Sequence, residues 1–301
     1  MNQNKKIAVT IITGFLGAGK TTFINALLKA NRNKHFALVE NEFGEVSIDT
    51  KLIKGVDASQ MFELREGCIC CTISDEYELV LQELAERFPN VEHLLIETTG
   101  VANPAQVVRP FFREEDLQKM YSFNGIICLV DALNFENETE SELKNKQVAI
   151  ADLVLISKTE KLISDEKERL KSQVRRINPL CETQYAENGI TEWNKLDNLS
   201  SRIKYFPEIK TNHSEITSRT LTFKKPLNKE KFISWLSYNL DVYKNEIYRV
   251  KGILCFENEP YESILQGLGG SFELTEGENL ISDNKCEIVF IGKLNGLNIE
   301  F

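Results

Sequence analysis

The chain has 301 residues, of which 42% are hydrophobic and 27% charged, and its formal net charge is −9. This composition excludes a disordered or fibrous protein, and the length favours two domains over one. A net acidic chain lacks the basic face that nucleic acid and anionic membranes require, so neither is expected as a partner. No apolar run approaches the ~18 residues of a membrane-spanning helix, and the apolar residues 7–12 are too few for a secretory signal. We therefore expect a cytoplasmic protein.

In the first two thirds of the chain, short apolar runs alternate with segments of helical spacing. Three helices are predicted, at 20–30, at 75–88 and at 164–177. The second is capped by Ser74, and its apolar residues keep helical spacing as far as Phe88. Strands are predicted at 7–13, 36–39, 61–64, 94–96, 125–130 and 153–156. Continuous apolar strands with helical crossovers predict an α/β fold, in which a mostly parallel sheet has helices on both faces.

The pattern changes after Pro207. Residues 208–214 are polar and are predicted to form a linker. Beyond the linker, one face of a predicted helix carries Phe232, Trp235, Leu236 and Leu240, and strands are expected at 217–223, 248–256 and 287–291. We therefore expect a first domain at 1–207 and a small α+β domain at 215–301.

A phosphate-binding loop is predicted at residues 14–21, which read GFLGAGKT and match G-x-x-x-x-G-K-[ST] between a strand and a helix. In such a loop, backbone N–H groups and the positive end of the helix dipole face the phosphates. Lys20 is expected to reach the β- and γ-phosphates, and the Thr21 hydroxyl to bind Mg²⁺. The other loop residues expected to contact the nucleotide are Gly14, Gly17, Ala18, Gly19 and Thr22.

The predicted strand at 94–96 runs into Glu97-Thr98-Thr99-Gly100. Glu97 is expected to hold Mg²⁺, directly or through water, and the Gly100 N–H to sense the γ-phosphate. Alone, this short motif also fits a solvated turn, and its position in the strand–helix alternation is what favours the phosphate role. With Lys20 and Thr21, Glu97 completes the expected catalytic set of a P-loop nucleotide hydrolase.

Ser157-Lys158-Thr159-Glu160 follows the predicted strand at 153–156 and is a degenerate form of N-K-x-D. A carboxylate at Glu160 can accept hydrogen bonds from the N1–H and amino groups of guanine, whereas N1 of adenine is itself an acceptor. The Lys158 stem can lie over the base, and Ser157 takes the place of Asn. The motif favours GTP and GDP over ATP, and an exposed polar loop is the alternative interpretation.

Three of the seven cysteines lie together at Cys68, Cys70 and Cys71. Residues two apart in an extended segment point the same way, and Cys71 joins the other two if the chain turns there. Thiolates favour Zn²⁺ or Cu⁺ over Mg²⁺, and three ligands leave one tetrahedral position open for transfer to a partner. Buried or redox-active cysteines are the alternative.

Residues 40–45, which read ENEFGE, leave the second predicted strand where switch segments approach the γ-phosphate in this type of fold. Carboxylates in this loop can supply an oxygen ligand to a metal, although a solvated acidic loop fits equally well. None of His35, His93 and His213 is paired with another at a ligand spacing, so each is expected to be structural.

The motifs GFLGAGKTT, ENEFGE, GCICC, ETTG and SKTE, in this order, resemble those of the CobW-type P-loop GTPases of the CobW/HypB/UreG class. The resemblance continues in YRVKG, LQG and VFIG of the C-terminal region. It implies a GTPase that binds Zn²⁺ or Co²⁺ and serves metal homeostasis or the delivery of metal to a client metalloprotein. The metal-binding positions of the family map onto Cys68, Cys70 and Cys71, with Glu40 and Glu45 as nearby or alternative ligands.

The sequence departs from the family pattern in three respects. It has no His-rich stretch, Ser157 and Glu160 alter the guanine motif, and Val101 stands where a Ras-like GTPase places its water-orienting Gln. We expect slow intrinsic hydrolysis and a switch in which GTP orders the acidic and cysteine loops before metal transfer. A nucleotide-tuned zinc sensor or buffer and a P-loop small-molecule kinase are the alternatives. Both a monomer and a homodimer are compatible with the sequence.

Overall fold

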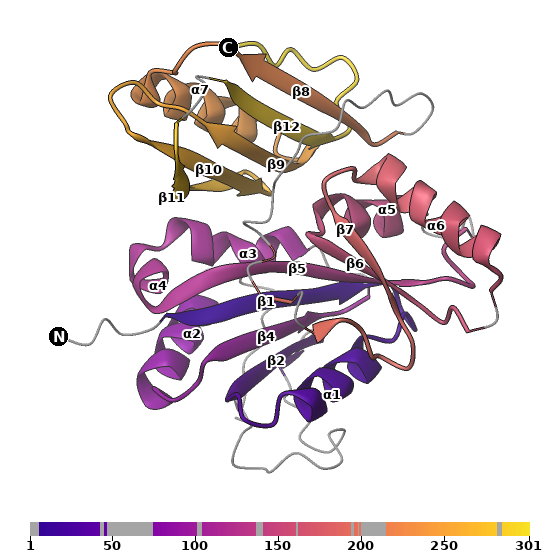
Figure 1. Ribbon diagram of the computed structural model, residues 1–301. Coiled ribbons are helices and arrows are strands. Elements are labelled where there is room, and N and C mark those ends of the chain that lie inside the picture. The colour runs from indigo at the N-terminus through magenta and orange to yellow at the C-terminus, as the bar shows by residue number, and fades with distance from the viewer. Residues whose placement is uncertain are drawn as a thin grey trace.

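A computed structural model describes residues 6–42, 45–46, 75–100, 104–136, 141–160, 162–193, 196–197, 199, 215–281 and 285–301. The chain forms two sheets, one above the other in Figure 1. The predicted strand at 61–64, the cap at Ser74 and the linker at 208–214 lie outside the described residues. Among the residues described, no helix is long and apolar enough to cross a membrane.

The first sheet has seven strands in the order β3-β2-β4-β1-β5-β6-β7. Only β3 pairs antiparallel with its neighbour, which confirms the predicted mostly parallel sheet. Its strands are β1 (Ile7–Gly14), β2 (Phe36–Glu42), β3 (Glu45–Val46), β4 (His93–Thr98), β5 (Tyr121–Asp131), β6 (Leu153–Ser157) and β7 (Glu182–Ala186).

Helices cover both faces of this sheet, as predicted. One face packs against α1 (Lys20–Ala30) and against Trp193, Leu196 and Leu199. The other face packs against α2 (Asp75–Arg87), α3 (Pro104–Arg113), α4 (Glu115–Met120), α5 (Ser141–Ile150) and α6 (Ser164–Ile177). The bounds of α1 and α6 coincide with the predicted ranges. By contrast, α3, α4, α5 and β7 were not predicted.

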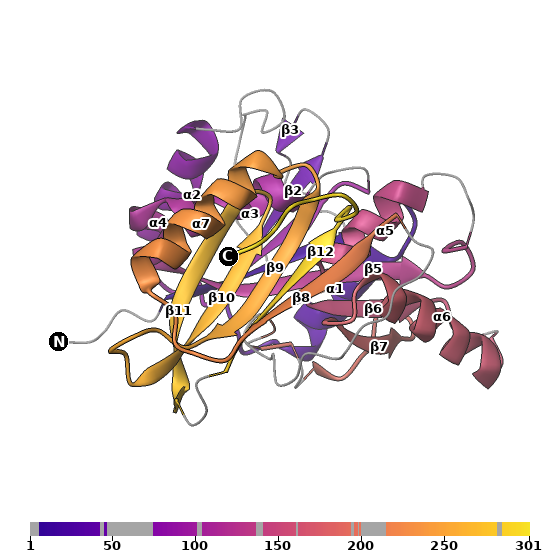
Figure 2. The same cartoon turned by 90° about the horizontal axis from the view of Figure 1, so that it is seen from above.

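The second sheet is antiparallel, in the order β11-β10-β9-β12-β8. It comprises β8 (Thr217–Phe223), β9 (Ile247–Leu254), β10 (Tyr261–Leu268), β11 (Ser271–Leu280) and β12 (Cys286–Gly292). Helix α7 (Lys229–Val242) covers its outer face, as Figure 2 shows, and begins at Asn228, whose side chain accepts a hydrogen bond from the Lys231 N–H. The small α+β fold was predicted, whereas the hairpin of β10 and β11 was not.

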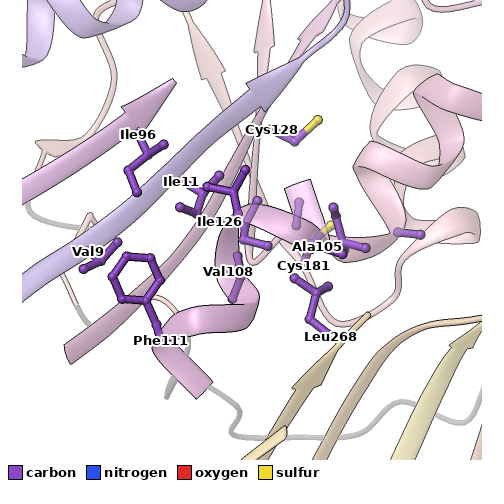
Figure 3. Close-up of a cluster of buried hydrophobic side chains, with 14 of the residues drawn as sticks. Val9, Ile11, Ile96, Ala105, Val108, Phe111, Ile126, Cys128, Cys181 and Leu268 are labelled. Atoms are coloured by element: carbon purple, nitrogen blue, oxygen red, sulfur yellow. The ribbon is translucent and has the colours of Figure 1, made fainter. Parts of the chain in front are cut away.

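The inner face of the second sheet rests on α3 and α5. Leu268 joins Ala105 of α3 in one hydrophobic cluster with the first sheet, as Figure 3 shows. The backbones approach closely here, since a Cβ on Gly269 would lie 2.6 Å from the Ala105 Cβ. The Arg113 guanidinium also donates to the Gly270 carbonyl at 3.1 Å. The two sheets therefore share a continuous apolar interface.

A buried ionic cluster crosses this interface. Asp152, which directly precedes β6 and is fully buried, accepts a hydrogen bond from Arg249 at 2.7 Å and forms an ion pair with Lys251 of the same strand, β9. Its second carboxylate oxygen accepts from the Ile126 N–H at 2.8 Å. Burial favours a higher pKa for Asp152, but Arg249 and Lys251 outweigh burial and hold the pKa below its ordinary value. The cluster thus joins the two sheets through a charged carboxylate.

Candidate nucleotide-binding site

The P-loop connects β1 to α1, as the motif predicts. Gly17 and Gly19 have φ values of 76° and 95°, in the left-handed region that favours glycine. The Lys20 ammonium donates to the Gly14 carbonyl at 3.0 Å. Burial lowers the pKa of Lys20, and the Glu97 carboxylate partly opposes that shift. The loop therefore brings a largely buried cation and the N-terminus of α1 to one end of the sheet.

The end of β4 lies beside this loop, because the β1–β4 register places Ile12 opposite Glu97. The Thr98 hydroxyl donates to the Thr13 hydroxyl at 3.1 Å. Gly100 lies directly against the loop, since a Cβ on it would come within 2.5 Å of the Leu16 nitrogen. The structure therefore brings Glu97 and Gly100 to the P-loop, where the sequence places them.

Gln147 of α5 contacts this region and was not among the predicted site residues. Its buried side-chain amide donates to the Gly100 carbonyl at 3.0 Å. The sequence carries no signal for this contact, because α5 was not predicted and 47 residues separate the two partners. Helix α5 thereby contacts both the Gly100 turn and the second sheet.

The SKTE segment begins at Ser157, the last residue of β6, at the same edge of the sheet. The buried Ser157 hydroxyl donates to the Ala18 carbonyl of the P-loop at 2.8 Å, so the position that replaces Asn connects the segment to the phosphate loop. Lys158 has a φ of 58° and forms an ion pair with Asp131 at 2.7 Å. Glu160 is exposed at this edge. Of the three predicted base-binding residues, Ser157 therefore contacts the P-loop directly, and Lys158 and Glu160 follow it along the chain.

A turn at residues 187–190 also reaches this edge and was not predicted. It follows β7 and closes with hydrogen bonds in both directions between Glu187 and Ile190. Gly189 has a φ of 80°, and a Cβ on it would lie 2.6 Å from the Thr22 carbonyl at the start of α1. The Asn188-Gly189 dipeptide is a turn signal that could have located this turn.

Replacing Gly189 with Ala is expected to displace this turn from α1 and weaken nucleotide binding. The left-handed backbone costs a non-glycine residue about 1–2 kcal/mol, and the contact with Thr22 adds to that. Gly296→Ala is the matched control, because Gly296 has a φ of 81° and open space around its Cβ position. Nucleotide titration and urea unfolding of both variants test this prediction. Equal losses of nucleotide affinity in the two would contradict it.

Several predicted metal ligands cannot be placed. Cys68, Cys70 and Cys71 lie outside the described residues, as does Val101. The backbones of Glu40 and Glu45 belong to β2 and β3, and Glu40 is in register with Glu97, but their side chains are not among those described. Among the residues described, no group of three His, Cys, Asp or Glu side chains could hold a metal.

The other cysteines and His93 have the environments of core residues. Cys128, Cys181, Cys255 and Cys286 are all buried. Burial raises the pKa of the Cys181 thiol to about 12, so it stays protonated at neutral pH. His93 is buried beside the Thr10 hydroxyl at 2.7 Å, and burial lowers its pKa to about 3. The environment of His93 agrees with the expectation that this histidine is structural.

Two family models match the chain. One, described as the nucleotide-binding domain of CobW/HypB/UreG, covers residues 8–184, and the other, described as the C-terminal domain of the cobalamin synthesis protein cobW, covers residues 216–300. The chain belongs to the CobW family. Zinc chaperone YjiA of Escherichia coli is 33% identical to this CobW-family chain over 276 residues, which span 87% of this chain and 86% of YjiA.

Other CobW-family comparisons also extend over most of the chain. Zinc-regulated GTPase metalloprotein activator 1 of Schizosaccharomyces pombe is 27% identical over 95% of this chain and 82% of its own length. The crystal structure of Zn(II)-bound YjiA GTPase from Escherichia coli matches with a TM-score of 0.67 and 29% identity, over 97% of this chain and 95% of that one. The likeness therefore includes both sheets.

Proposed function

We propose that this CobW-family protein is a GTPase that couples GTP binding and hydrolysis to the transfer of zinc to a client protein. One observation carries the GTPase assignment: the P-loop, the Glu97–Gly100 turn and the SKTE segment meet at one edge of the sheet. The zinc assignment draws support from relatives that this chain matches over most of their length and that are named zinc chaperone and zinc-regulated GTPase metalloprotein activator. In this proposal the protein is cytoplasmic. Residues 1–207 form the GTPase domain, residues 208–214 the linker and residues 215–301 the C-terminal domain.

The phosphates are held by the P-loop backbone at Gly14, Gly17, Ala18, Gly19 and Thr22. Lys20 contacts the β- and γ-phosphates, and the Gly100 N–H contacts the γ-phosphate. Thr21 and Glu97 hold Mg²⁺, which supplies positive charge to the phosphates when bound. The influence of Glu97 on the pKa of Lys20 fits this role, because it places the carboxylate near the P-loop cation. Ser157, Lys158 and Glu160 form the base side of the site.

Zinc is the cargo in this proposal, with Co²⁺ as an alternative metal. Cys68, Cys70 and Cys71 supply the thiolates, with Glu40 and Glu45 as nearby oxygen ligands. The register that places Glu40 opposite Glu97 supports the coupling, because it connects the acidic segment to the nucleotide edge. The partner that accepts zinc is a client metalloprotein, and the protein acts as a monomer or a homodimer.

Zinc affinity is expected to differ by about tenfold between the protein bound to a non-hydrolysable GTP analogue and the protein bound to GDP, both with Mg²⁺. The difference is expected because the acidic segment adjoins the nucleotide edge. Linkage adds that if GTP changes the affinity for zinc, zinc changes the affinity for GTP by the same factor. Chelator competition on the fully reduced protein measures the first quantity, and GTP titration with and without zinc measures the second. The Cys70→Ser variant should lose zinc binding and keep nucleotide binding.

Equal zinc affinities in the two nucleotide states would separate the metal from the GTPase cycle. A zinc buffer or sensor would then describe the protein better than a delivery protein. ATP binding as tight as GTP binding, with transfer of phosphate to a small acceptor, would instead indicate a kinase.

A further inference from the structure

The base side of the proposed nucleotide site contains an ion pair whose acidic member, Asp131, belongs to none of the sequence motifs. Lys158, the lysine of the SKTE segment, lies one residue beyond the pair formed by Asp131 of β5 and Ser157 of β6. Its ammonium is 2.7 Å from one carboxylate oxygen of Asp131. The Lys158 side chain is 42% exposed, whereas that of Asp131 is only 9% exposed. An accessible lysine is thus held at its tip by a fixed, buried carboxylate.

Asp131 is itself held in place by its own loop. One carboxylate oxygen accepts from the Leu133 N–H at 2.9 Å, and the other accepts from the Asn134 side chain at 2.9 Å. Burial favours a higher pKa for Asp131, but the hydrogen bonds from Lys158, Asn134 and Leu133 outweigh it and lower the pKa. The carboxylate therefore stays charged at neutral pH and keeps one orientation.

The lysine also starts from a defined backbone position. Its φ of 58° is in the left-handed region, which is unfavourable for a non-glycine residue and persists only where the surrounding structure holds it. The preceding Ser157 is tied to the P-loop through the Ala18 carbonyl. Both ends of the Lys158 side chain are thereby fixed relative to the phosphate loop.

We propose that Asp131 is a positioning residue for nucleotide recognition, which holds the Lys158 stem as a preformed wall for the base. This inference rests on the proposed GTPase site. A free lysine side chain loses much rotamer entropy when it is ordered. Asp131 meets that cost before the nucleotide arrives, so the stem can cover the base without further ordering. The ion pair compensates for a base motif in which Ser157 and Glu160 replace the usual Asn and Asp.

The test compares a ligand that has a base with one that has none. Asp131→Ala is expected to weaken GDP binding about tenfold and to leave pyrophosphate competition unchanged, because pyrophosphate contacts only the phosphate loop. Asp116→Ala is the matched control, since Asp116 pairs with Lys119 at the same 2.7 Å distance on exposed α4. It should change neither ligand. Parallel losses of GDP and pyrophosphate affinity in Asp131→Ala would indicate a damaged P-loop and overturn the proposal.

A double-mutant cycle shows whether Asp131 acts through Lys158. Lys158→Met removes the ammonium that pairs with Asp131, so it should weaken GDP binding and leave pyrophosphate binding unchanged. The double variant should bind GDP no more weakly than Lys158→Met. Lys158→Arg, which can keep the ion pair, should retain GDP binding. If Asp131→Ala does not fold, the Met and Arg variants decide the question, and equal GDP affinities for them would refute it. If the wild-type protein binds GDP no better than pyrophosphate, the proposed GTPase site fails as well. If the wild type prefers GDP but Asp131→Ala and Lys158→Met bind GDP as tightly as the Asp116→Ala control, the GTPase site stands and Asp131 has no role in it.

Discussion

Replacing Asp152 with leucine is expected to lower the free energy of unfolding by about 3–5 kcal/mol, the typical cost of removing one partner from a buried ion pair. The change leaves Arg249 and Lys251, which are 1% and 3% exposed, without the carboxylate that they share. It also removes the acceptor of the Ile126 N–H. Because Asp152 and the two cations lie on opposite sides of the interface, the loss should fall on the contact between the sheets.

The two tryptophans allow this effect to be measured in each sheet separately. Trp193 stacks on Phe23 beside α1, whereas Trp235 lies on α7 of the second sheet. Urea unfolding followed through each tryptophan, with the other replaced by Phe, should give coincident transitions in the wild type and separate transitions in Asp152→Leu. Asp116→Leu is the control, since exposed pairs contribute at most about 1 kcal/mol.

Two further results would support the ionic explanation. Adding Arg249→Met and Lys251→Met to Asp152→Leu should recover most of the loss, because a well-packed apolar cluster can replace a buried ion pair. The folded-state pKa of Asp152 lies below the ordinary value of 3.8, so its contribution to stability is complete above that pH and is lost as the pH falls toward the folded-state pKa. The triple variant should lack this acid-sensitive contribution. An unfolding midpoint of Asp152→Leu equal to that of Asp116→Leu would contradict the explanation.

Replacing Lys20 with alanine is expected to reduce GTP affinity by about 100-fold or more. The Lys20 ammonium is largely buried and donates to the Gly14 carbonyl, so it is already directed into the loop that receives the phosphates. A hydrogen bond to a charged group contributes about 1.5–3 kcal/mol, and the β- and γ-phosphates offer more than one such contact. Titration with a fluorescent GTP analogue measures the loss.

Lys29→Ala is the matched control for this prediction. Lys29 lies in the last turn of the same helix and is exposed, so its replacement removes the same charge without touching the loop. Zinc affinity in the absence of nucleotide should be unchanged in both variants. A Lys20→Ala protein that still binds GTP within threefold of wild type would refute the phosphate role of this lysine.

Local signals explain which helices and strands could be predicted. The bounds of α1 and α6 follow from helical periodicity, a glycine loop before α1 and Pro179 after α6. Helix α3 could not be predicted because it contains Pro110, which usually ends a helix. Helix α5 could not be predicted because its buried face carries the polar residues Lys144 and Gln147, which interrupt the apolar periodicity. The hairpin of β10 and β11 turns at Gly269-Gly270, and a two-glycine pair is a local turn signal from which this hairpin could have been predicted.

The residues of the site likewise fall into two groups, those that local motifs predict and those that only the fold brings together. The P-loop, the Gly100 turn and the SKTE segment are each contiguous in sequence and lie at the ends of predicted parallel strands. The alternation of strands and helices was therefore enough to predict that they meet at one edge of the sheet. Contacts between distant residues could not be predicted without the fold: Asp131 and Lys158 are 27 residues apart, and Asp152 and Arg249 are 97 apart. Each of these pairs depends on how strands or sheets are placed next to one another.

The position of β1 in the sheet also determines when the phosphate loop can form during synthesis. Its two neighbours are β4 and β5, which lie far along the chain, with Ala8 opposite His93 and Ile7 opposite Tyr121. A growing chain therefore carries the complete P-loop sequence with no strand on either side of β1 until β4 emerges from the ribosome. At about 5–20 residues per second, β5 follows the P-loop after roughly ten seconds. Nucleotide can stabilise this domain only after that interval, so it cannot assist the earliest folding steps.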